Sequence, residues 1–91
     1  MVSESVRDTL IKYKSEILNI SAQKDLKEFE RNTLQKFYLL IEKALLNKID
    51  ERRYDANTII KARTLEFGII LSASNNSSIR NLVNKLNLGI I

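Results

Sequence analysis

The six residues from Asp50 to Asp55 form the densest group of reactive side chains in this 91-residue sequence. They comprise three acids, two arginines and one tyrosine. The guanidinium groups of Arg52 and Arg53 are suited to gripping phosphate, and the carboxylates of Asp50 and Glu51 to holding a metal ion. A metal site needs carboxylates from several elements, and one corner does not supply them. We therefore favour a solvated turn between two helices over a functional site. Among the functional alternatives, the strongest is that Arg52 and Arg53 are contacts of a protein interface.

Seven basic residues, spread over the middle of the chain, are candidates for a strip that faces a polyanion. They are Lys36, Lys43, Lys48, Arg52, Arg53, Lys61 and Arg63. Lys36 and Lys43 are seven residues apart and therefore share one side of a helix. Phosphate contacts need positive charge within reach rather than a strict spacing. Because Glu42, Asp50 and Glu51 interrupt the series, we favour a solvated charged surface over a nucleic-acid site.

Residues 77–89 resemble the first helix of a helix-turn-helix motif, with a glycine at the turn. In that motif a recognition helix must follow the turn to enter the major groove, and only two residues follow here. This version of DNA binding is therefore disfavoured. A weaker alternative remains, in which this helix contacts a groove or phosphates directly through Arg80, Asn81, Asn84 and Lys85.

The composition excludes much catalytic chemistry. The chain has no Cys, no His, no Pro, no Trp and two Gly, with a formal net charge of +4. Without thiol or imidazole groups it lacks the usual nucleophiles and zinc ligands, and no phosphate-binding or calcium loop is present. We expect no enzymatic activity, no cofactor and no metal site. The absence of disulfides favours a reducing compartment, and no leader or transmembrane span is evident, so we expect a cytoplasmic protein without membrane partners.

The apolar pattern predicts an all-α fold, a compact bundle of about four helices in one domain spanning residues 1–91. Absence of Pro and scarcity of Gly favour long helices over hairpins. Apolar residues recur at three- and four-residue steps, as in an amphipathic helix. The first helix shows this in Val6, Leu10, Tyr13, Ile17 and Ile20. The predicted helices cover about residues 3–20, 24–49, 56–73 and 78–88.

Two of these helices carry more apolar surface than one stripe. The second, at about 25 residues, would be nearly 40 Å long, and places Tyr38 and Leu46 off its main stripe. The third is apolar almost all round from Leu65 onward, which predicts a central, buried helix. Within it, Gly68 indicates a close helix crossing. Either the buried third helix absorbs this apolar excess, or the excess marks an interface. Such an interface is expected at Tyr38 and Leu46 or at the terminal Ile90 and Ile91.

The sequence therefore predicts a non-catalytic accessory subunit that docks on a larger protein. Residues 56–91 carry four basic side chains against one acidic. This bias suggests an assembly that handles nucleic acid, such as a DNA polymerase, replication or transcription complex. The first alternative is direct, largely sequence-neutral DNA or RNA binding, and the second is a helical homodimer. The residues expected to bind nucleic acid are Lys36, Lys43, Lys61, Arg63, Arg80 and Lys85.

Overall fold

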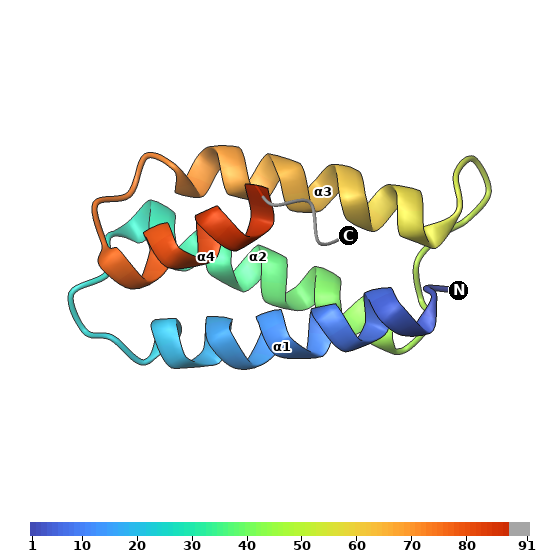
Figure 1. Ribbon diagram of the computed structural model, residues 1–91, viewed down its shortest axis with the longest axis horizontal. Helices are drawn as coiled ribbons and strands as arrows, with labels where there is room; N and C mark the ends of the chain where they lie inside the picture. Colours follow the sequence, from blue (N-terminus) through green and yellow to red (C-terminus); the bar gives the residue numbers. More distant parts are fainter. Residues whose placement is uncertain (88–91) are drawn as a thin grey trace.

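The computed structural model describes residues 1–87, which form four α-helices. They are α1 (Glu4–Ser21), α2 (Glu28–Leu45), α3 (Ala56–Leu71) and α4 (Ser77–Asn87). Successive helices run in opposite directions and pack on each other, and α4 also packs against α1 (Figure 1). The prediction of an all-α bundle of four helices is confirmed.

The core lies between the four helices and centres on Phe37 of α2. The ring of Phe37 stacks on Phe67 of α3, with centroids 5.0 Å apart, and lies 6.2 Å from the ring of Tyr13. The predicted stripe of α1 is the buried side of that helix, and the same holds for α4. The buried residues of α4 are Ile79, Leu82, Val83 and Leu86.

The prediction of a long second helix over residues 24–49 is wrong. Helix α2 has 18 residues, as many as α1. At its start, the Glu30 carboxylate accepts a hydrogen bond of 2.6 Å from the N–H of Lys27. At its end, Asn47 adopts a left-handed conformation with φ of 56° and its N–H donates to the carbonyl of Ala44. Such a residue ends a helix, because it turns the chain away from the helical path. The other three helices end within two residues of their predicted bounds.

The expectation that α3 is buried all round is also wrong. Helix α3 packs on α2 and α4 and lies along one edge of the bundle (Figure 1), so no described helix covers its outer side. On that side, Leu65 and Ile69 are 48 % and 73 % exposed. Its buried residues are Ala56, Ile60, Thr64, Phe67, Gly68 and Leu71. The close crossing expected at Gly68 is present, since Leu86 of α4 lies against it.

Candidate interaction surfaces

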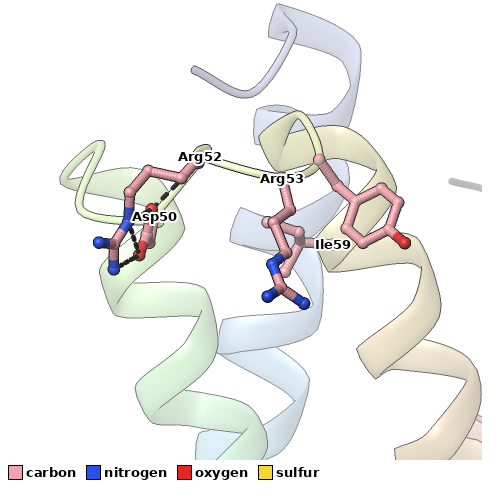
Figure 2. A pocket seen from close by; sticks show the side chains of 5 residues that line it. Asp50, Arg52, Arg53 and Ile59 are labelled. Atoms are coloured by element: carbon pink, nitrogen blue, oxygen red, sulfur yellow. Dashed lines mark hydrogen bonds and ion pairs between the residues drawn. The ribbon is translucent and has the colours of Figure 1, made fainter.

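The loop between α2 and α3 forms a pocket of about 410 Å³. Figure 2 shows its lining residues, which are Asp50, Arg52, Arg53, Tyr54 and Ile59. The guanidinium of Arg52 donates to the Asp50 carboxylate through Nη2 at 2.6 Å and Nε at 2.9 Å, and the Arg52 N–H donates at 3.0 Å. The ion pair lowers the pKa of Asp50 and raises that of Arg52. Asp50 therefore already has its counter-ion.

The other two acids of this loop, Glu51 and Asp55, accept hydrogen bonds from the N-terminus of the chain and from the start of α3. The Glu51 carboxylate accepts from the Met1 amino group at 2.5 Å and from the N–H of Ala56 at 2.8 Å. These contacts lower the pKa of Glu51, the amino group most strongly. Asp55 accepts from the N–H of Thr58 at 2.9 Å and so caps α3. Over residues 1–87, no three acidic side chains converge as a metal site requires. The geometry matches the capped turn favoured from the sequence.

Arg53 differs from Arg52 in its surroundings. Its side chain extends beside Ile59 (Figure 2), and none of the ion pairs formed by residues 1–87 involves its guanidinium. The neighbouring Tyr54 is 63 % exposed. Arginine and tyrosine are the residue types that most often anchor protein interfaces. In the loop between α2 and α3, Arg53 rather than Arg52 is therefore the arginine available for a polar contact with a partner.

A second pocket, of about 300 Å³, lies between α1 and α2. Most of its lining comes from apolar side chains or the stems of polar ones. The lining residues are Ile17, Leu18, Ser21, Arg31, Leu34, Gln35 and Tyr38. A groove between antiparallel helices with an apolar floor is a common place for a partner helix to bind.

Exposed apolar side chains border this groove on both helices. On α1, Ile11 and Leu18 are seven residues apart and share one side. On α2, Leu39 lies one turn beyond the groove residue Gln35, and Leu46 caps the end of the helix on the same side. Leu18, Leu39 and Leu46 are 51 %, 53 % and 59 % exposed. We call this surface the α1/α2 face. It comprises Ile11, Leu18, Tyr38, Leu39 and Leu46.

An ion pair between the two helices crosses the middle of the α1/α2 face. Lys14 Nζ lies 2.6 Å from Glu42 Oε1 and 5.6 Å from the centroid of the Tyr38 ring. The hydrogen bond between the two side chains raises the pKa of Lys14 and lowers that of Glu42. The cation above the ring holds Tyr38 against the groove. Tyr38 is therefore half-buried at the edge of the groove, whereas Leu46 projects into solvent.

The basic residues expected to bind nucleic acid do not form one strip. Lys36 and Lys43 are exposed on the same side of α2. Arg63 lies 5.4 Å above the ring of Phe67, which stacks on α2, so it lies at the α2 edge of α3. Its Nε is 3.5 Å from Glu66. Lys61 precedes Arg63 by two residues and thus points about 200° away around the helix.

The two basic residues of α4 lie on further sides of the bundle. Lys85 pairs with Glu16 of α1, and Arg80 donates to the carbonyl of Ser74 at 3.3 Å. The structure thus spreads the six residues over several sides. The other two predicted interface residues, Ile90 and Ile91, lie outside the described residues.

Sequence reasoning missed three residues of the α1/α2 face, namely Ile11, Leu18 and Leu39. It also missed a buried polar contact, in which the hydroxyl of Ser74 donates to the carboxylate of Glu30. Both residues are almost completely buried. A signal was available for the leucines and isoleucine, because each lies off the main stripe of its helix at a seven-residue spacing. No such signal existed for Glu30.

Together these features define a small four-helix bundle with two uncovered apolar surfaces, the α1/α2 face and the outer side of α3. None of the four described helices is both long and apolar enough to span a bilayer. No family model matches the sequence, and neither a curated protein nor a solved structure matches it significantly.

Proposed function

We propose that this protein is a non-catalytic interaction subunit that docks on a larger protein through the α1/α2 face. The observation that carries the proposal is the exposure of Leu18, Leu39 and Leu46 on the two helices that enclose a groove. Isolated exposed apolar residues are ordinary on a soluble protein, but several of them on the two helices that enclose one groove are typical of an interface.

The occupant that suits this groove is an amphipathic helix of the partner. Its apolar side would lie over Leu18 and Tyr38, and the rims would meet its flanks. Arg31 at one end of the groove holds two loop carbonyls, of Gln23 and Lys24, through Nη2. Arg53 lies beside Ile59 of α3, outside this groove, and would add a separate polar contact with the partner.

The larger assembly is proposed to handle nucleic acid, such as a polymerase, replication or transcription complex. The support is the net charge of +4 and its concentration toward the C-terminal half. Direct binding to DNA or RNA is the alternative. It is less well supported, because the basic side chains lie on different sides of the bundle and two of them, Arg63 and Lys85, face acidic neighbours.

The test is a pull-down from native extract with wild-type protein, Leu39→Glu and Leu46→Glu, with and without nuclease and at two salt concentrations. Asn75→Glu, at an exposed polar position in the loop before α4, is the matched control. We expect a stoichiometric protein partner that survives nuclease and high salt with wild type and control, and that both leucine variants lose. Equal capture by all four proteins would contradict the proposal. Recovery of nucleic acid alone, released by high salt, would favour direct binding.

A further inference from the structure

The outer side of α3 is a second apolar surface, distinct from the α1/α2 face. It lies opposite the buried residues of α3, and it contains Ala62, Leu65 and Ile69, all exposed. Ile69 is 73 % exposed, more than any other large apolar residue of the described helices. Leaving a large aliphatic side chain of a helix in water forgoes the main source of stability that this small bundle has.

The spacing along this side follows the repeat of a coiled-coil seam over about one and a half heptads. Ala62, Leu65, Ile69 and Ser72 follow one another at steps of three, four and three residues, which are the steps of the inner positions of a heptad. The large residues occupy the centre of the stripe and the small ones its ends. A stripe of this kind is complementary to a copy of itself.

The flanking charges select the direction of pairing. Lys61 lies just before the first inner position of the stripe and Glu66 just after the second, five residues apart. In a parallel pair of helices, residues at these two positions face each other across the seam, so each Lys61 meets the Glu66 of the other helix. In an antiparallel pair centred on the same stripe, the two Glu66 side chains would approach each other.

The acidic partner in this scheme is accessible. Glu66 is 64 % exposed in its side chain, and its contact with Arg63 of the same helix is long, at 3.5 Å. Lys61 is exposed, and none of the ion pairs among residues 1–87 uses it. Both charges are therefore available to a second molecule.

We propose that a second copy of this chain covers the outer side of α3, in a two-fold dimer whose two α3 helices run parallel. Leu65 and Ile69 pack on their own counterparts, and two Lys61–Glu66 pairs flank them. The 16 residues of α3 span about 24 Å, so the contact is smaller than a standard protein interface. The dimer is accordingly weak and forms as the protein concentration rises.

Sedimentation equilibrium over a range of concentrations tests the association. We expect wild type to dimerise and Ile69→Glu to stay monomeric at the same concentrations. Lys61→Glu should weaken the dimer several-fold, and the double exchange Lys61→Glu with Glu66→Lys should restore it. Leu39→Glu, on the α1/α2 face, is the control that leaves association unchanged. Circular dichroism checks that each variant is folded, which we expect because all four positions are exposed.

Single cysteines test the geometry, because the natural chain has none. In the parallel pair each position of the stripe faces itself, so Ala62→Cys and Ser72→Cys should each form a disulfide-linked dimer under mild oxidation. Ser15→Cys, exposed on α1, should not. The proposal would be overturned if wild type stayed monomeric at all concentrations, or if Ile69→Glu dimerised as strongly as wild type. Cross-linking only between a 62 variant and a 72 variant would show antiparallel pairing and overturn it as well. If wild type is monomeric and captures another protein, and Ile69→Glu no longer captures it, the outer side of α3 binds that protein instead of a second copy.

Discussion

Gly68 of α3 lies directly against Leu86 of α4, so that a Cβ atom placed on the glycine would be 3.7 Å from both the Cβ and the Cδ1 of the leucine. That distance is ordinary van der Waals contact. The crossing is therefore close, but it does not require the absence of a side chain.

Gly68→Ala should stabilise the protein by about 1 kcal/mol, because glycine in a helix interior costs about that much relative to alanine. Urea denaturation of wild type and variant measures the difference. Gly68→Leu is the contrasting variant. Its larger side chain must displace Leu86, and we expect a loss of roughly 1–3 kcal/mol. Equal destabilisation by both substitutions would mean that α4 packs more tightly on α3 than the structure shows.

Asn47 is the only non-glycine residue among those described that has a positive φ, at 56°. Asn47→Ala should cost about 1 kcal/mol, since a Cβ-bearing residue without a short polar side chain disfavours this conformation. Asn47→Gly should be neutral or stabilising. Thermal unfolding of the two variants and of wild type checks whether Asn47→Gly is more stable than Asn47→Ala. The opposite order of stabilities would show that α2 continues as a regular helix at this end.

Glu30 should make the stability of the protein depend on pH. The hydroxyl of Ser74, and next the N–H of Lys27, hold the pKa of Glu30 below its ordinary value of 4.5. A lowered folded-state pKa gives stability that is fully present above the ordinary pKa and is lost as the pH falls through the folded value. We therefore expect Glu30→Gln to narrow the difference in unfolding free energy between neutral pH and a pH well below 4.5.

The matched control for this prediction is Glu28→Gln, an exposed position in the first turn of the same helix. The comparison separates the contribution of Glu30 from that of other carboxylates, which are present in both variants. Lowered pKa values are also found for Glu42, Asp50, Glu51 and Asp55. If Glu28→Gln and Glu30→Gln change the acid sensitivity equally, the buried contact with Ser74 is not its source.

Thr64 places a hydroxyl in the core of the bundle. Its Oγ1 is buried and has no hydrogen-bond partner within residues 1–87. A buried hydroxyl without a partner costs about 1–3 kcal/mol, so Thr64→Val, which keeps the shape, should stabilise the fold by about 1 kcal/mol. Chemical denaturation checks the sign. A loss of stability on this substitution would show that the hydroxyl makes a contact after all.

The buried sides of α1 and α4 could be predicted from sequence, because each helix carries a single apolar stripe and the helical period fixes which residues share it. The ends of α2 could not. Glu30 and Asn47 are ordinary in a helix, and their roles at its ends arise from the loops that fold back on them. The orientation of α3 also escaped prediction, since both of its sides are apolar. Which one is buried depends on the neighbouring helices, and this places Thr64 and Gly68 inside and Ile69 outside.

The candidate surfaces were predictable to a similar degree. Tyr38 and Leu46 stood out as apolar residues away from the main stripe of their helix. Leu18 also lies off the main stripe of its helix, but a single helix does not show whether such a residue lies in the core or at its edge. The dispersal of the basic residues follows from helix geometry, as the separation of Lys61 and Arg63 shows. It became evident only when each helix had its neighbours.

The positions of α1 and α3 at diagonal corners of the bundle have a consequence for valency. The α1/α2 face and the outer side of α3 do not overlap, so a molecule can use both at once. A dimer joined through α3 therefore presents two identical docking faces. Such a bivalent unit would hold a target that carries two or more binding sites far more tightly than its single-site affinity implies, provided that the sites match the span between the faces.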